Sequence, residues 1–218
     1  QDSRIHIYQE PDHSIYEAMN QAVSHVTGDY ILFLNCGDLF YDREVLKHTA
    51  EYMEQHPMKF QGIYYGDTYS AKNDAKISSP PEITGFVCYR NIPCHQSCFY
   101  AADLCRQKPY EPKYRIRADY EHFLWCYYRA KAPMQYIGFT VSSYEGGGYS
   151  ETKENLKRSA QEHKEITAKY MTAGELFRYR TAMALTLAPL RTALAESKHF
   201  SGIYQGLMGK VYGRKREK

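Results

Sequence analysis

The segment from residue 14 to residue 38, SIYEAMNQAVSHVTGDYILFLNCGD, constrains the fold of this chain more than any other. Ser14 and Glu17 have the spacing of a capping box, in which each residue satisfies a free backbone donor at a helix start. Apolar residues at helical spacing then predict one buried stripe, formed by Ile15, Ala18, Met19, Ala22, Val23 and Val26. Gly28 predicts a left-handed residue that ends this helix.

A buried strand is predicted directly after that glycine. Residues 30–34, YILFL, are apolar without alternation, which is typical of a strand covered on both faces. Asn35, Cys36, Gly37 and Asp38 interrupt the run with a polar tip. Ligands of open α/β sheets bind outside the carboxyl ends of strands, so this tip is the first place to expect a site.

The rest of the chain continues the alternation of strands and helices, which predicts an α/β fold. Strands are predicted at residues 5–8, 62–65, 98–100 and 134–142, and helices after Asp42, after Asp119, at 151–170 and from 175 onward. The strand at 62–65 is expected to end at Gly66 and Asp67. We divide the chain into an α/β domain, residues 1–150, and a C-terminal helical extension, residues 151–218.

Composition excludes several classes of protein. Apolar residues make up 43% of the chain and charged residues 24%, as in a soluble globular protein. No apolar run reaches the roughly 20 residues that span a bilayer. The six cysteines include no C-x-x-C pair, which favours a reduced, cytoplasmic compartment. The group Cys88, Cys94, His95 and Cys98 matches no standard zinc spacing and disfavours a zinc site.

The C-terminal tail carries the excess positive charge. Residues 196–218 contain six Lys/Arg and two Asp/Glu, a net charge of +4, against +3 for the whole chain. Apolar residues four apart in this tail predict an amphipathic helix at the inner face of a membrane. The alternative is a solvated, frayed terminus. Because the charge is confined to the tail, nucleic acid is not expected as a partner.

Two carboxylates are the main candidates for chemistry. Asp38 offers a hard oxygen ligand for Mg²⁺ or Mn²⁺, although Asn, Gly and Asp are also common turn residues. Asp119 lies where a loop enters a helix, so free N–H groups and the helix dipole keep it ionised, as a general base requires. The competing interpretation is a plain helix cap, and Glu121 is the alternative base.

Other polar residues are candidates for binding a sugar or a phosphate. His95 and Gln96 precede a predicted strand and could hydrogen-bond such a ligand, or His95 could bind a metal or simply pack. Arg115 and Arg117 could neutralise a phosphate or could lie in a solvated loop. The glycine run at residues 146–148 allows close backbone approach to a pyrophosphate.

In this order, these segments resemble family 2 of the nucleotide-sugar-dependent glycosyltransferases, in the branch of bacterial surface-polysaccharide synthesis. The segments that carry the resemblance are SIYEAMN (14–20), TGDYILFLNCGD (27–38), CHQS (94–97), ADYE (118–121) and GGGYS (146–150). They lie within residues 5–150, and nothing after Glu151 matches the family.

The resemblance implies a GT-A fold, a doubly wound mixed sheet, and an inverting transfer of sugar from a UDP- or GDP-sugar to a glycan or lipid-linked acceptor. It implies that Asp38 is the last acid of a metal-binding tip, that Asp119 is the catalytic base, and that a divalent cation, Mg²⁺ or Mn²⁺, is the cofactor. The remaining residues that it implies for substrate binding are Asn20, Asn35, Gly37, His95, Gln96, Arg117, Gly146, Gly147 and Gly148.

Two departures from the family pattern are visible. Asn35 and Gly37 replace the earlier acids of the tip, so Asp38 is expected to rely more on the diphosphate for holding the metal. The family's first strand, first helix and nucleotide-binding Asp should precede Arg4, so we expect an N-terminal segment to be missing here. The alternative function is therefore an inactive remnant, or a binding and assembly module with the same fold.

Overall fold

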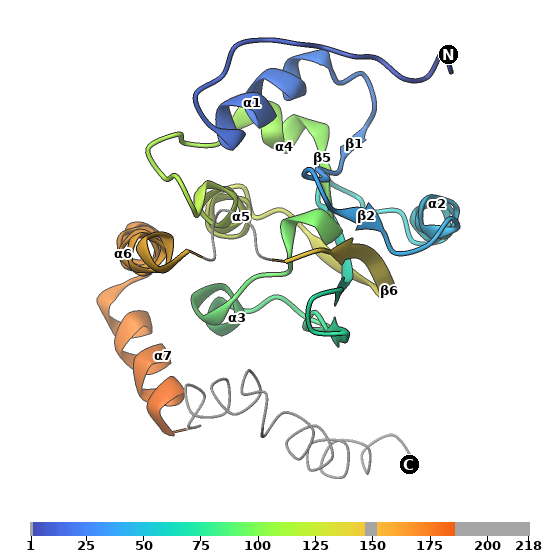
Figure 1. The fold of residues 1–218 in the computed structure, drawn as a ribbon. Helices are drawn as coiled ribbons and strands as arrows, with labels where there is room; N and C mark the ends of the chain where they lie inside the picture. The colour runs from blue at the N-terminus through green and yellow to red at the C-terminus, as the bar shows by residue number, and fades with distance from the viewer. Residues whose placement is uncertain (1, 147–151, 186–218) are drawn as a thin grey trace, which may run out of the picture. The chain divides into compact units, whose positions relative to one another are not determined.

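A computed structural model describes residues 2–146 and 152–185 of the chain (Figure 1). The chain divides into two compact units, Gln1–Tyr170 and Met171–Lys218. The helix α6 (Lys153–Tyr170) thus belongs to the same unit as the sheet. The glycines Gly147 and Gly148 and the tail at 196–218 lie outside the described residues.

A mixed sheet forms the centre of the first unit. Its strand order is β1-β5-β3-β6-β2, with β4 paired to β3. The strands are β1 (Tyr30–Ile31), β2 (Leu39–Phe40), β3 (Ile63–Ser70), β4 (Ala75–Ile77), β5 (Cys98–Ala101) and β6 (Met134–Tyr144). Only β3 and β6 pair in parallel, while the other described pairs are antiparallel.

Helices cover both faces of this sheet (Figure 1). The helices of the first unit are α1 (Ile15–His25), α2 (Val45–Gln55), α3 (Gly85–Arg90), the 3-10 turn η1 (His95–Ser97), α4 (Ala102–Gln107), α5 (Ala118–Tyr128) and α6. Tyr64 of β3 meets Tyr52 of α2 on one face. Tyr100 of β5 meets His122 of α5 on the other face. The predicted α/β class with a mixed, doubly covered sheet is confirmed.

The helix α1 starts as predicted and ends earlier than predicted. The Ser14 hydroxyl accepts from the Glu17 N–H at 3.2 Å, as an N-cap does. The Glu17 carboxylate accepts from the N–H of His13, not from that of Ser14, so the capping box is not reciprocal. The helix stops at His25 with an extended Val26, and Gly28 has no left-handed backbone. The predicted glycine stop is therefore wrong.

Two strand predictions near the N-terminus are also corrected. Residues 5–8 form no strand, and Ile5 and Ile7 are exposed, because no neighbouring strand in the described chain pairs with them. The predicted strand at 30–34 is reduced to the two residues of β1, which lies at the end of the strand order and pairs only with β5. Apolar sequence alone did not reveal that this strand has a partner on one side only.

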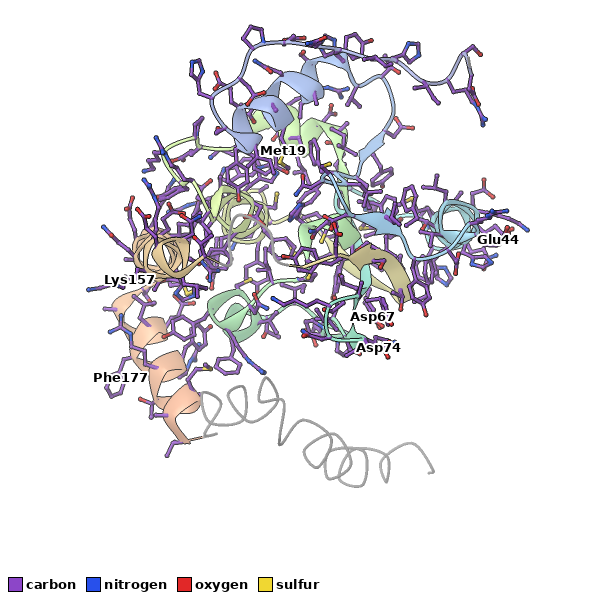
Figure 2. All side chains as sticks on the ribbon, viewed as in Figure 1. Met19, Glu44, Asp67, Asp74, Lys157 and Phe177 are labelled. Atoms are coloured by element: carbon purple, nitrogen blue, oxygen red, sulfur yellow. The ribbon has the colours of Figure 1, made fainter. Side chains whose placement is uncertain are left out.

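The strand β3 is longer than predicted and passes through Gly66 and Asp67. A side chain at Gly66 would collide with the Phe139 carbonyl of β6, so the glycine here permits close strand packing instead of a turn. Asp67, which is labelled in Figure 2, lies on β3 and its side chain is fully buried. Its carboxylate accepts from Tyr136 and from the Ser79 N–H, and it pairs with Lys76 at 2.6 Å.

The helix α5 is held to α6 by a buried ion cluster around Glu121. Lys108 and Lys169 lie 2.9 and 2.7 Å from the Glu121 carboxylate, and the Tyr170 hydroxyl also donates to it. Glu121 is fully buried, so the carboxylate is compensated only because these partners surround it. This environment assigns Glu121 to structure and argues against it as the alternative base.

The described part of the second unit contains the helix α7 (Ala173–Leu185). Thr172 and Glu175 form a reciprocal capping box at its start: the Thr172 hydroxyl accepts from the Glu175 N–H, and the Glu175 carboxylate accepts from the Thr172 N–H. Phe177 and Leu185 are exposed on this helix. No helix in the described part of the chain is long and apolar enough to span a membrane.

Candidate active site

Asp119 lies in the first turn of α5, as the sequence predicted. Its Oδ1 atom accepts from the Tyr16 hydroxyl at 2.9 Å, and its Oδ2 atom lies 3.5 Å from Nδ1 of His95. The Asp119 side chain remains 20% exposed. Tyr16 comes from α1, His95 from η1 and Asp119 from α5, so three separate elements fix the position of one carboxylate.

These contacts keep Asp119 ionised. Burial by itself would raise the pKa of the carboxyl group, but the contacts with His95, the Tyr16 hydroxyl and the Tyr120 N–H outweigh it. The pKa of Asp119 therefore lies below its ordinary value. Asp119 is thus a carboxylate at neutral pH, which is the form that takes a proton from a hydroxyl group.

The tautomer of His95 follows from its second partner. Asn35 donates from Nδ2 to Nε2 of His95 at 3.0 Å. Because Nε2 accepts, the proton of a neutral imidazole is on Nδ1, the atom that faces Asp119. Asn35 of the predicted tip is in this way connected through His95 to the predicted base.

Asp38 is connected to η1 through Gln96, the residue after His95. Gln96 donates from Nε2 to Oδ2 of Asp38 at 2.9 Å, and the Glu145 N–H lies 3.4 Å from Oδ1. Gln96 is buried, while Asp38 is only half-buried. Adjacent residues of η1 therefore contact the two candidate carboxylates, His95 the base and Gln96 the tip.

Glycines shape the loops on either side of Asp38. Gly37 has φ +95°, and a side chain there would collide with the Glu145 carboxylate. Gly146 has φ +84° and lies against Lys72. Glu145, which the sequence analysis missed, places a second carboxylate beside the tip, although it is 107 residues from Asp38.

The donor set around Asp38 fits a hard divalent cation held partly by substrate. Within residues 2–146 and 152–185, no group of three or more His, Cys, Asp or Glu side chains is arranged to bind a metal. Mg²⁺ is commonly held by one or two carboxylates together with substrate phosphates. Asp38, with Glu145 close by, offers such carboxylate oxygens, and the cation remains an untested prediction.

Two predicted binding residues have other contacts. Asn20 donates to the Tyr110 carbonyl and accepts from the Tyr110 N–H, so both ends of its amide fix the loop after α4. The Arg117 guanidinium donates to the carbonyl and hydroxyl of Ser159 on α6. The structure therefore does not bring either side chain to Asp38 or Asp119, and their roles in substrate binding remain predictions. Arg115 lies in an exposed part of the loop.

A second group of polar side chains is buried under α5 and is not a reactive centre. Nε2 of His122 lies 3.6 Å from Sγ of Cys126 and 3.9 Å from Sγ of Cys105. Burial lowers the pKa of His122 to about 4 and raises the pKa of the Cys105 thiol to about 12. The imidazole is thus neutral and the thiol stays protonated. All six cysteines of the chain are free thiols.

The chain matches the family model described as "Glycosyl transferase family 2" over residues 1–102. A "PGL/p-HBAD biosynthesis glycosyltransferase" of Mycobacterium bovis is 32% identical over 160 residues, which are 71% of this chain and 61% of that protein. The chain belongs to glycosyltransferase family 2. Family membership, together with the mixed sheet, confirms the predicted GT-A-like fold class.

Other proteins are similar at lower identity. An uncharacterized glycosyltransferase of Mycobacterium tuberculosis is 26% identical over 117 residues, 53% of this chain and 45% of that protein. Among solved structures, S. aureus TarS 1-349 in complex with UDP is similar with a TM-score of 0.47 and 12% identity, covering 80% of this chain and 56% of that chain. The matched part of this chain thus spans about 61% of the length of the Mycobacterium bovis glycosyltransferase.

Proposed function

We propose that the full-length protein transfers a sugar from a nucleoside-diphosphate sugar to a hydroxyl group of a glycan or lipid-linked acceptor, with inversion at the anomeric carbon. The observation that carries the proposal is η1, whose adjacent residues His95 and Gln96 contact Asp119 and Asp38. One turn thereby relates a carboxylate base to a half-buried carboxylate that would share a divalent cation with the donor's diphosphate. Membership in family 2 supports the same chemistry.

Asp119 is proposed to act as the general base. It accepts the proton of the acceptor hydroxyl while that oxygen forms the new bond to the anomeric carbon and the bond to the nucleoside diphosphate breaks. Its pKa lies below the ordinary value because of its contacts with His95, Tyr16 and the Tyr120 N–H, so the acid limb of the pH–rate profile is expected below the ordinary pKa of an aspartic acid. Tyr16 and His95 orient the carboxylate and are expected to remain in place during the step.

Asp38 is proposed to contribute to a site for Mg²⁺ or Mn²⁺ at the donor diphosphate. A cation bound there would supply Lewis-acid stabilisation of the leaving group's charge. Gln96 holds one oxygen of Asp38, and Asn35 and Gly37 shape the loop that presents it. The glycine run at 146–148 starts at Gly146, next to Glu145 and the tip, and is proposed to approach the donor.

The test uses a panel of UDP-glucose, UDP-galactose, UDP-N-acetylglucosamine and GDP-mannose with the full-length protein. Protection against thermal unfolding in the presence of Mn²⁺, with less protection after Asp38→Asn, is the expected result. Absence of protection by every donor, with and without the cation, contradicts the donor proposal. That outcome would favour a non-catalytic binding or assembly module with the same fold.

A further inference from the structure

The helix α6 turns a polar face toward the rest of the first unit, and it lies beyond residues 1–102, which match the family model. Its buried residues recur at helical spacing, at Asn155, Ser159, Glu162, Ile166, Thr167 and Tyr170. Four of these six side chains, those of Asn155, Ser159, Glu162 and Thr167, are polar, which is unusual for a helix face that packs on a core. Lys157, which is labelled in Figure 2, is exposed on the same helix. The polar face requires a partner of its own.

The partner is a run of backbone N–H groups directly before α5. The Glu162 carboxylate accepts from the N–H groups of Arg115, Ile116 and Arg117 at 3.0, 3.0 and 2.9 Å. Glu162 is only 6% exposed, and Nε of Arg158, on the same helix, donates to its Oε1 atom at 3.1 Å. Arg117 is the N-cap residue of α5, and Arg115 and Ile116 directly precede it, so an ionised acceptor on these N–H groups also lies at the positive end of the helix dipole.

The same turn is held from its other side by α1. The Tyr16 hydroxyl lies 2.8 Å from the carbonyl oxygen of Ile116 and 2.9 Å from Oδ1 of Asp119. Glu162 therefore fixes the N–H groups of the turn, and Tyr16 fixes a carbonyl group of the turn and the carboxylate that follows it. Asp119 comes only two residues after Arg117, so a shift of this turn moves Asp119 as well.

We propose that Glu162 is a positioning residue for Asp119, and that α6 is in this way part of the active site. The proposal rests on the proposed role of Asp119 as the base. A carboxylate is suited to this position because it offers two acceptor oxygens and no donor. Glutamine has the same shape but only one acceptor oxygen, and its NH₂ group would face backbone donors.

The test compares Glu162→Gln with Glu165→Gln in the full-length protein. Glu165 lies one turn further along α6 and is matched in chemistry, but it accepts from the Tyr114 hydroxyl and contacts no backbone N–H of the turn. Glu162→Gln is expected to lower kcat about 10- to 100-fold, because small displacements of a reacting group have effects of this size, and to leave the KM for the donor unchanged. Glu165→Gln is expected to keep the wild-type kcat.

A double-mutant cycle separates positioning from a general effect on folding. In the Asp119→Asn background, Glu162→Gln should cause little further loss of kcat, because the carboxylate that it positions is already absent. Glu162→Asp keeps the charge and both acceptor oxygens, and should recover part of the kcat. It also serves as the test variant if the glutamine variant does not fold. Hydrogen exchange at the amides of residues 115–117 reports the contact independently of turnover.

Two results would overturn the proposal in distinguishable ways. Wild-type kcat in a folded Glu162→Gln protein, or losses that simply multiply with those of Asp119→Asn, would refute the positioning role alone. Full activity of Asp119→Asn would refute the proposed base, and the role of Glu162 would fall with it. Donor protection in the thermal assay is expected to persist in all these variants, because none of the altered side chains contacts Asp38.

Discussion

The two ends of the candidate site differ in how firmly they are held. Asp119 is fixed by Tyr16 and His95, and Glu162 binds the turn before it, whereas Asp38 has one short hydrogen bond, from Gln96. A general base must lie within hydrogen-bond distance of the hydroxyl proton that it accepts, so its carboxylate is held in position before the substrate binds. A carboxylate that shares a cation with a diphosphate can be completed by the substrate itself.

The strongest test of this contrast is Asp119→Asn. The amide keeps the shape of the side chain but cannot accept the proton, so kcat should fall by about 10²–10⁴. Donor binding at the Asp38 end should survive, as measured by thermal unfolding with UDP-sugars and Mn²⁺. A protein that retains full kcat would show that the firmly held end is not the base.

The free energy of unfolding should depend on pH through His122, which lies on the same helix as Asp119. An unfolded histidine protonates near its ordinary pKa of 6.5, but burial lowers the pKa of His122 in the folded protein to about 4. Between these values the unfolded state binds more protons, so stability falls as the pH drops from 6.5 toward 4. The loss should reach about 3 kcal/mol, since one pKa unit corresponds to about 1.36 kcal/mol.

Urea unfolding at a series of pH values measures this loss. His122→Phe removes the titrating group and suits the ring contacts that His122 makes with Tyr100 and Tyr110. The variant should show a flatter stability curve between pH 6.5 and 4. An unchanged slope in the variant would assign the acid sensitivity to other groups.

The Asp38 end should respond to Gln96, because that amide is its main anchor. Gln96→Met keeps the size of the side chain and removes the donor to Asp38. Loss of a group that orients a metal ligand typically weakens metal binding about 10- to 100-fold. Isothermal titration of UDP-glucose with Mn²⁺ should show a decrease of this size, while titration without the cation should show little change.

Gln61→Met is the matched control for that experiment. Gln61 is an exposed glutamine whose amide contacts Asp103, away from the tip. The Gln61→Met variant should bind the donor and the cation with the affinity of the wild type. If both substitutions weaken binding of UDP-glucose and Mn²⁺ equally, the effect is a general one, and Gln96 has no specific role in orienting Asp38.

The smallest effect is expected at the cap of α1, the helix that carries Tyr16. Ser14→Ala removes the acceptor for the Glu17 N–H and should cost about 1 kcal/mol of unfolding free energy. Ser24→Ala, in the same helix, removes a hydroxyl that donates to the Gln21 carbonyl and should change stability by less than about 0.5 kcal/mol. Equal effects would show that the cap does not stabilise this helix.

The predicted candidates differ in how well sequence alone placed them. Local motifs predicted the candidates Asp38, His95, Gln96 and Asp119. In the structure, Gln96 contacts Asp38 and His95 contacts Asp119, and both contacting residues belong to η1. Asn20 and Arg117 were chosen in the same way, but their polar atoms bind Tyr110 and Ser159. A polar side chain near a motif has several partners within reach, and sequence does not tell which one it meets.

The missed residues had no local signal. Tyr16 occupies a buried position of an amphipathic helix, where an aromatic ring is expected for packing alone. Glu145 lies 107 residues from Asp38, and Glu162 lies 45–47 residues from the backbone N–H groups that it contacts. An unpaired carboxylate in a polar helix looks like a solvated surface residue until the neighbouring turn is placed.

Local sequence patterns were enough to predict the α/β alternation, the start of α1 and the candidate residues Asp38 and Asp119, because helix periodicity, caps and apolar runs are local properties. Tertiary structure alone decided that residues 5–8 form no strand, that β1 is a short edge strand, and that α6 supplies Glu162 to the turn before Asp119. Strand pairing and the partners of buried polar groups depend on contacts between distant segments, and a local pattern cannot specify those contacts.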